Sequence, residues 1–370
     1  MDRPDRRIGR RLAIAAIALL GLAVIGWSLL PNGKLARVER RSDCHDPAAL
    51  PKVETLADGR KAMRLRVLLW NVEGLPWPIR SGRGPKLAAI ANWIAARRKA
   101  GLGPDILILH KAFIPEASRI PIAAGFASVV PGPALGAKRS LPSATPPADY
   151  ADGAHWWKGE GIGKWLDGGL YVATDLPVAS AAREAFGADS CAGYDCLSNK
   201  GAEWLALQLP GAPEPLYLFN THRNSREPSK VAIARAEASH ILQTRENDAF
   251  LAGLPVSAAM IAAGDFNNYR AGDKSGRFAA DTAFHLAAKG AGFAARPAPM
   301  TDAAAWTQAY DLLGFSSSDG LTVEPLAVAT LFDGKNGPRL SDHAAQYVIF
   351  RIGWRGDAKP MPTTLKTCPA

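Results

Sequence analysis

The sequence predicts an α+β fold in which two mixed β-sheets pack together, with helices on the outside. Strand-like apolar runs outnumber helical ones, and several of these runs follow one another directly along the chain. The sequence also has no Gly-x-Gly-x-x-Gly motif, which is typical of doubly wound nucleotide-binding folds. These observations favour packed mixed sheets over a single parallel sheet.

Each predicted element rests on the spacing of its apolar residues. Short apolar runs between turn residues predict strands at 64–70, 105–109, 170–174, 203–209, 216–220, 257–263 and 346–352. Helical spacing predicts helices at 86–99, 231–249 and 282–289. The stretch 131–166, rich in Pro, Gly and Ala, shows no periodicity, and loops of this length are often functional.

The composition is that of a globular protein with a basic N-terminus. The chain has 370 residues, of which 48% are hydrophobic and 21% charged, with a net charge of +10. Nine Lys or Arg residues and three Asp or Glu residues fall within 1–41, so most of the net charge lies there. The rest of the chain is only mildly basic and gives no indication of a nucleic-acid groove.

The N-terminus predicts a membrane anchor. A basic segment at 1–11 precedes an apolar run at 12–30, in which Ser28 is the only polar side chain. As a helix this run would be about 28 Å long, close to the thickness of a bilayer core. We expect a single-pass signal-anchor in a bacterial inner membrane, with the N-terminus in the cytoplasm. A cleaved signal peptide, which would leave a secreted protein, and a buried soluble helix are the alternatives.

In the leading interpretation the rest of the chain faces the periplasm. We expect a linker at 31–63, one domain at 64–356, a C-terminal tail at 357–370, and a monomer. The four cysteines suit an oxidising compartment. Cys191 and Cys196 could close a small loop, and a Cys44–Cys368 bridge would hold both ends of the domain, but other pairings remain open.

Four polar motifs, each beside an apolar run, carry the chemistry. In chain order they are Asn71 with Glu73, Thr221 with His222, Asp265 with Asn267, and Asp342 with His343. Strand ends that meet at one edge of a sheet can bring such groups together. Residues two apart on a strand face the same side, which predicts that Asp265 and Asn267 together orient a water molecule. Adjacent Asp342 and His343 would point oppositely, so another carboxylate should hold His343.

These motifs resemble the endonuclease/exonuclease/phosphatase superfamily, and within it the sphingomyelinase-like phosphodiesterases. The resemblance runs from about Leu65 to Phe350 and includes the stretch 167–178 and the Ser-Asn-Lys-Gly sequence at 198–201. It implies a four-layer α/β/β/α sandwich of the DNase I type. It also implies hydrolysis of a phosphate ester with Mg²⁺ or Mn²⁺.

The resemblance assigns a role to each residue. Asp265 would activate the water that Asn267 positions, and His343 would act in acid–base catalysis, held by Asp311. His222 would contact the phosphate. Asn71 would ligate the metal, with Glu73 and Asp342 as further candidate ligands. Phosphate could also be bound by Asn267, Lys111, Lys200 and Arg223, although an exposed loop position for Lys200 is the simpler alternative.

Lys111 departs from the family pattern. Members usually carry a metal-ligating Glu at this strand end, and an ammonium group cannot ligate Mg²⁺. Three interpretations follow. Glu73 could compensate as a ligand, Lys111 could itself neutralise the phosphate, or the protein could be a catalytically degenerate binder.

The predicted substrate is a phospholipid headgroup or a similar phosphate ester, and the anchor would hold the domain beside lipid. A nuclease of the same superfamily is the alternative, with nucleic acid as a less favoured partner. Trp77, Trp156 and Trp157 could contact lipid or line a pocket, or could be packed on the domain.

Overall fold

A computed structural model describes residues 37–267, 311–363 and 365–368. The predicted anchor at 12–30 and the predicted helix at 282–289 lie outside these residues. Within them, no helix has both the length and the apolar content needed to cross a membrane.

Two large sheets form the centre of the molecule. The seven-stranded sheet has the order β12-β13-β3-β4-β6-β5, with β2 also paired to β3. Its strands are β2 (Val53–Thr55), β3 (Lys61–Gly74), β4 (Ile106–Ala112), β5 (Ser128–Pro131), β6 (Tyr171–Thr174), β12 (Thr322–Leu331) and β13 (Ala345–Trp354). The five-stranded sheet has the order β11-β10-β9-β8-β7. Its strands are β7 (Val178–Ala185), β8 (Gly201–Leu207), β9 (Leu216–His222), β10 (Met260–Asp265) and β11 (Asp311–Ser316).

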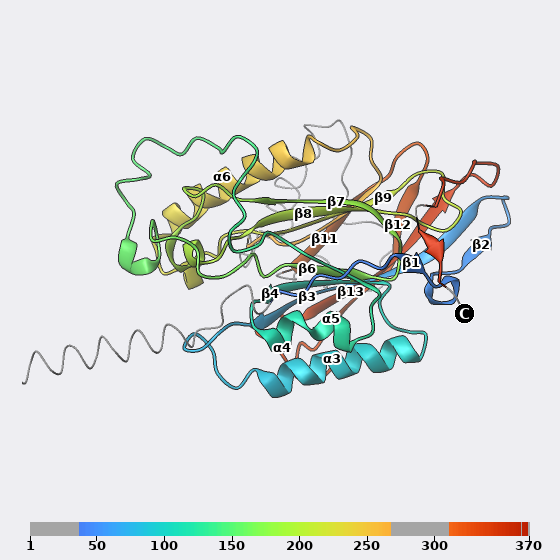
Figure 1. The fold of residues 1–370 in the computed structure, drawn as a ribbon, viewed down its shortest axis with the longest axis horizontal. Helices are drawn as coiled ribbons and strands as arrows, with labels where there is room; N and C mark the ends of the chain where they lie inside the picture. The colour runs from blue at the N-terminus through green and yellow to red at the C-terminus, as the bar shows by residue number, and fades with distance from the viewer. Residues whose placement is uncertain (1–36, 268–310, 364, 369–370) are drawn as a thin grey trace, which may run out of the picture.

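Helices cover the outer face of each sheet and complete four layers (Figure 1). The helix α6 (Ile233–Leu251) lies over the five-stranded sheet. The helices α3 (Gly84–Lys99), α4 (Pro115–Ser118) and α5 (Ile120–Ala123) lie over the seven-stranded sheet. This arrangement confirms the predicted α/β/β/α sandwich.

Alternation along the strands explains why the sheets pack face to face. In β3, Met63, Leu65, Val67 and Leu69 join the core between the two sheets, whereas Leu68 and Trp70 join the core under α3. In β9 and β10, alternate residues face either the other sheet or α6. Both faces of these strands are therefore buried, which is why they read as nearly continuous apolar runs.

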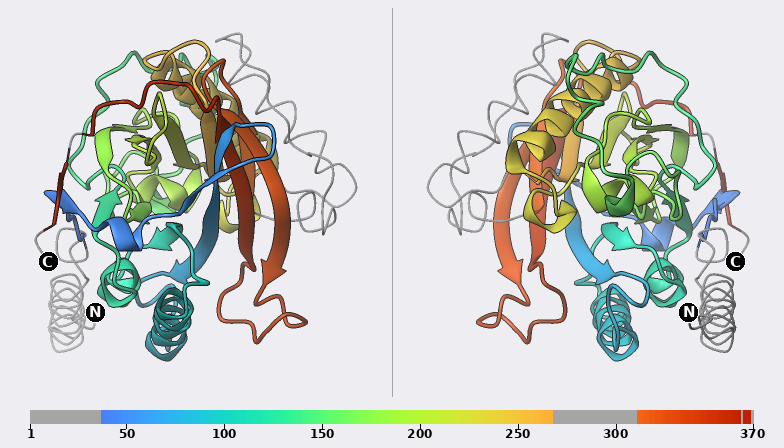
Figure 2. Two further views of the ribbon diagram at one scale, coloured as in Figure 1. Left: turned by 90° about the vertical axis from the view of Figure 1, so that its right-hand side faces the viewer. Right: turned by 90° about the vertical axis from the view of Figure 1, so that its left-hand side faces the viewer.

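The fold extends beyond the predicted domain boundaries. In the predicted linker, β1 (Cys44–His45) pairs in parallel with β14 (Lys366–Thr367) from the predicted tail. Disulfides join Cys44 to Cys368 and Cys191 to Cys196. The first of these holds both ends of the described chain together, as Figure 2 shows for the blue and dark red segments.

Candidate phosphoryl-transfer site

The polar residues of the motifs lie on the strand faces that point into the space between the two sheets. His222 is the register partner of Asp265, and Asp265 is in turn the register partner of Asp311, so the three form a row across β9, β10 and β11. Asn71 and His110 are partners at the ends of β3 and β4 on the other sheet. Each continues the alternation of apolar residues that face the space between the sheets. Two polar rows therefore meet in the interior.

Asp265 lies at the centre of this meeting point. Its Oδ2 accepts a hydrogen bond from Nδ2 of Asn71 at 2.9 Å and lies 3.4 Å from Nε2 of His222. Nδ2 of Asn71 is also 3.5 Å from Nε2 of His343. All four side chains come from motifs that the sequence predicts to converge.

The structure shows the predicted contact between His343 and Asp311. Nδ1 of His343 lies 3.0 Å from Oδ2 of Asp311, so Asp311 favours the imidazole with its proton on Nδ1. Burial alone would lower the pKa of His343, but Asp311, and then Asp265, raise it above its usual value. Burial would likewise raise the pKa of Asp311, yet His343 and His110 hold it well below its usual range. His343 is thus arranged to carry a proton.

His222 is held in the neutral form. Nζ of Lys200 lies 3.1 Å from Nε2 of His222, and the same ammonium donates to the carbonyl oxygen of Arg223 at 2.9 Å and approaches Oδ1 of Asp195 at 3.2 Å. Because an ammonium can only donate, Nε2 must accept, which leaves the proton on Nδ1. Burial, and then the charge of Lys200, lower the pKa of His222 well below its usual value. Nδ1 is buried and has no hydrogen-bond partner among the described residues.

Lys200 is therefore not on an exposed loop. Its side chain is 6% exposed, and burial lowers the pKa of its ammonium. Its three contacts use the three N–H donors of the ammonium. The role that its position supports is to orient His222.

His110 is a site residue that the motif analysis did not single out. Its ring is buried, with Nε2 2.7 Å from Oδ1 of Asn220 and Nδ1 3.5 Å from Oδ1 of Asp311. It also stacks on His222, with ring centroids 5.6 Å apart. The sequence could have indicated this residue, because His110 lies on the same face of its strand as the buried Ile106 and Ile108. A polar side chain on that face must find a hydrogen-bond partner inside the protein.

The hydrogen-bonded chain continues from Asn220 to Glu203. Nδ2 of Asn220 donates to Oε1 of Glu203 at 2.9 Å. Burial raises the pKa of Glu203 to about 7, against the opposing effect of this hydrogen bond. A polar chain therefore runs between the two sheets from Glu203 through Asn220 and His110 to Asp311.

Three residues near strand ends depart from strand alternation. Glu73, Lys111 and Asn267 have φ angles of 53°, 51° and 53°, in the left-handed region that residues other than glycine rarely adopt. Asn267 lies beyond the end of β10, where its backbone N–H donates to Oδ1 of Asp265 at 3.3 Å and its Nδ2 donates to the carbonyl oxygen of Arg223 at 2.9 Å. Asn267 thus lies beside Asp265, as predicted. A turn places it there, and not the alternation of side chains along a strand.

Glu73 does not lie with Asn71 as a metal ligand. Its Oε1 is 2.6 Å from Nε of Arg80, and its Oε2 is 3.2 Å from Nη1 of Arg83. Arg83 also donates to the carbonyl oxygens of Glu73 and Val72, at 2.9 Å and 2.7 Å. The left-handed backbone turns Glu73 toward these arginines, and both of its carboxylate oxygens are engaged there.

Arg223 and Asp342 also depart from their predicted roles. The guanidinium of Arg223 is buried and donates to the carbonyl oxygen of Phe266 at 3.1 Å and to Oγ1 of Thr244 at 2.6 Å, so it supports the fold beneath the site. Asp342 has a side chain that is 38% exposed, and its Oδ2 is 3.8 Å from Nζ of Lys111. Arg223 is therefore not placed to bind phosphate, and Asp342 is not placed beside Asn71 as a metal ligand.

One group among the described residues could hold a divalent cation. It consists of Asp265, Asp311 and His343, whose candidate ligand atoms all lie within 4.8 Å of one another. Two carboxylates and an imidazole suit a divalent ion that accepts mixed donors, whereas Mg²⁺ prefers an octahedron of oxygen ligands. The donors therefore fit a cation at Asp265, Asp311 and His343, but the predicted set of Asn71, Glu73 and Asp342 is not assembled.

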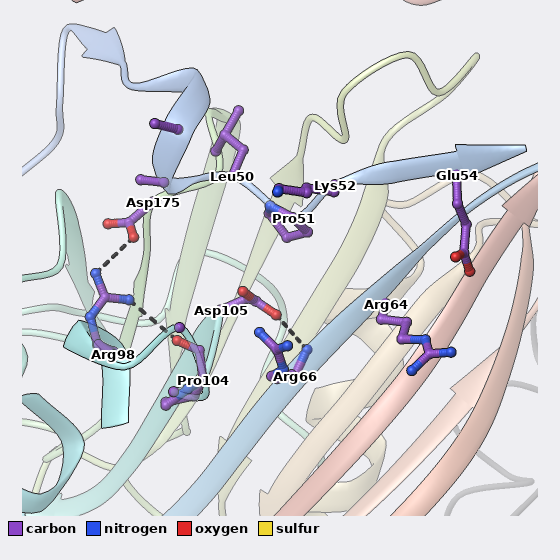
Figure 3. A pocket seen from close by; sticks show the side chains of 14 residues that line it. Leu50, Pro51, Lys52, Glu54, Arg64, Arg66, Arg98, Pro104, Asp105 and Asp175 are labelled. Carbon is purple, nitrogen blue, oxygen red and sulfur yellow. Dashed lines mark hydrogen bonds and ion pairs between the residues drawn. The ribbon is translucent and has the colours of Figure 1, made fainter. Parts of the chain in front are cut away.

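A separate pocket of about 560 Å³ opens toward the other end of β3, near Arg64 and Arg66 (Figure 3). Nη2 of Arg98 pairs with Oδ2 of Asp175 at 2.7 Å, and Oδ2 of Asp105 accepts from the backbone N–H of Arg66 at 2.7 Å. Burial raises the pKa of Asp105 to about 6. This pocket shares no residue with the site at Asp265.

Comparison with known structures agrees with this architecture. No protein-family model matches the chain. No curated protein matches it either. A Staphylococcus aureus beta toxin variant with bound magnesium ions is similar in structure, with a TM-score of 0.50 and 17% identity over 77% of this chain and 98% of that chain. SmcL is similar at a TM-score of 0.51 and 17% identity, over 78% of this chain and 98% of that chain.

The chain has the fold of these two proteins, a DNase I-like α/β/β/α sandwich. This is the fold that the resemblance of the motifs implies. A sphingomyelinase C from Streptomyces griseocarneus also aligns, with a TM-score of 0.47 and 19% identity over 77% of this chain and 98% of that chain.

Proposed function

We propose that this protein is a phosphoric ester hydrolase, acting as a phosphodiesterase on a phospholipid headgroup or a similar ester outside the cytoplasm. The observation that carries the proposal is the set of groups around Asp265. A carboxylate, an imidazole with a raised pKa and an imidazole with a lowered pKa lie within one cluster. Groups whose pKa values are pushed apart in this way are suited to acid and base roles in one reaction.

The reaction assigns one step to each residue. Asp265 accepts a proton from water as the water oxygen forms a bond to phosphorus, and protonated His343 gives its proton to the leaving oxygen as the old P–O bond breaks. His222, whose Nε2 lies 3.4 Å from Oδ2 of Asp265, would contact the phosphoryl group, and Asn267 fixes the turn beside Asp265. A divalent cation held by Asp265, Asp311 and His343 would require His343 in its neutral form, and would then supply in place of that proton the positive charge that neutralises the phosphoryl group.

Exposed aromatic residues support a lipid substrate. Trp77 and Trp156 are each 68% exposed, and Trp157 is 57% exposed, so none of them is packed in the core. They lie on the segment between β3 and α3 and on the long loop before β6. Both segments are at the left-hand end in Figure 1, where β3 ends. Trp favours the membrane interface, and the proposed anchor at 12–30 would hold this end near a bilayer.

The test compares substrates with the full-length chain in detergent. We expect hydrolysis of phosphocholine-headgroup lipid in vesicles and of a chromogenic phosphodiester, with no cleavage of plasmid DNA. His343→Ala should abolish both activities. Cleavage of DNA without lipid hydrolysis would favour the nuclease alternative, and absence of turnover on every substrate would favour a binding protein.

A further inference from the structure

Lys111, one residue before the end of β4, has a side-chain direction that strand alternation does not explain. Ile106, Ile108 and His110 face the five-stranded sheet, so alternation would turn Lys111 toward the helices. Its φ of 51° breaks this alternation, at a cost of about 1–2 kcal/mol for a residue other than glycine. Its side chain is only 16% exposed, and its Nζ lies 3.8 Å from Oδ2 of Asp342, next to His343.

The charge of Lys111 acts on the reacting groups. It contributes to the lowered pKa of His222, and it opposes the rise in the pKa of His343. It also contributes to the lowered pKa of Lys200. The Lys111 ammonium is therefore within electrostatic range of both imidazoles that the proposed reaction uses.

Among the described residues, no buried carboxylate forms an ion pair with this ammonium. Glu73, the acidic residue at the end of the neighbouring strand, is paired with Arg80 and Arg83. Asp342 is the carboxylate paired with Lys111 among the described residues, and it is partly exposed and 3.8 Å away. Pairs of this kind contribute about 0–1 kcal/mol, so an entering anion can displace Asp342 at low cost.

We propose that Lys111 binds the phosphate group of the substrate directly, so that the site holds a phosphate anion without a divalent cation. The identity of the anion rests on the proposed function. Lys111 thus supplies the positive charge that a metal ion would otherwise supply at this strand end. A cation at Asp265, Asp311 and His343 is not required for this binding.

The test measures binding of inorganic phosphate to the full-length chain by titration calorimetry in EDTA. We expect wild-type protein and Lys111→Arg to bind, and Lys111→Met to bind at least about tenfold more weakly. Lys99→Met removes the same charge from the exposed end of α3 and should bind like wild type. Asp342→Asn removes the competing carboxylate and should bind more tightly than wild type.

Two results would overturn the proposal. One is phosphate binding that requires added Mg²⁺ or Mn²⁺, and the other is unchanged binding by Lys111→Met. Thermal unfolding of each variant shows whether it is folded, and Lys111→Glu provides a second charge change if Lys111→Met is unstable. Lys111→Glu should lose phosphate binding and gain affinity for Mn²⁺.

The outcome is separate from that of the proposed function. Phosphate binding in EDTA by a protein that turns over no ester would uphold the role of Lys111 and remove the hydrolase. Ester hydrolysis by a protein that binds phosphate only with a metal ion would do the reverse.

Discussion

Nδ1 of His343 lies 3.0 Å from Oδ2 of Asp311, and Oδ1 of the same carboxylate lies 3.5 Å from Nδ1 of His110. One buried carboxylate therefore connects the imidazole proposed as the acid to the polar chain between the sheets. Asp311 stays ionised because both rings share its charge. The orientation and the proton of His343 both depend on this residue.

Asp311→Asn should lower kcat for the phosphodiester by about 100-fold or more, because the amide no longer stabilises the imidazolium. Asp311 raises the pKa of His343, so activity that needs the protonated ring is lost as pH rises through that pKa. In the variant this loss should occur at a lower pH. The pH dependence of kcat measures this change in the pKa of His343. If the loss of activity at high pH occurs at the same pH in both proteins, Asp311 does not set the protonation of His343.

Glu203 should make folding stability depend on pH. Burial raises its pKa to about 7 from an ordinary 4.5, so the unfolded chain ionises first as pH rises. The contribution of Glu203 to stability is then greatest below about pH 4.5 and falls by roughly 3 kcal/mol up to pH 7. Glu203→Gln should flatten this part of the curve in urea unfolding. Glu116→Gln, on the exposed face of α4, is the control, and parallel curves for wild type and Glu203→Gln would contradict the assignment.

Glu73→Gln should lower the free energy of unfolding without changing metal affinity. The variant weakens the contacts to Arg80 and Arg83, which we expect to cost roughly 1–3 kcal/mol. Calorimetric titration with Mn²⁺ should give the wild-type affinity, whereas Asp265→Asn should lose binding. A tenfold weaker affinity in Glu73→Gln would restore Glu73 as a ligand.

The exposed tryptophans should affect lipid and soluble substrates differently. Replacing Trp156 and Trp157 by Ala should reduce binding to phosphocholine vesicles, because both rings are available to the bilayer interface. Turnover of the soluble diester should not change, since the ring contacts of Trp156 and Trp157 are with each other and with His155. Vesicle flotation and diester assays on the same preparation separate the two effects. Equal vesicle binding by wild type and variant would show that these loops do not contact lipid.

Strand periodicity predicted much of the fold and the centre of the site. Asn71, His222 and Asp265 continue the inward phase of apolar runs, so their convergence follows from the strands themselves. Their partners at strand ends could not be predicted in the same way, because Glu73, Lys111 and Asn267 adopt left-handed backbone angles that periodicity does not encode. The arginines that hold Glu73 come from the loop after β3 and the start of α3, and no motif marks them.

Left-handed backbone conformations are concentrated near the proposed site. The described chain has five residues other than glycine with positive φ, and three of them, Glu73, Lys111 and Asn267, lie at or just beyond the ends of strands that carry site residues. Such conformations persist only where the surrounding structure holds them, and they are common at ligand sites. At Lys111 the conformation turns an ammonium toward the site.

The most direct test of the proposed hydrolase is steady-state hydrolysis of a chromogenic phosphodiester by the full-length protein and by Asp265→Asn, with Mn²⁺ and with EDTA. We expect turnover by wild type that the Asp265→Asn substitution abolishes, while the variant keeps the wild-type unfolding temperature within a few degrees. Turnover that survives Asp265→Asn, or none by wild type in either condition, would contradict this proposal.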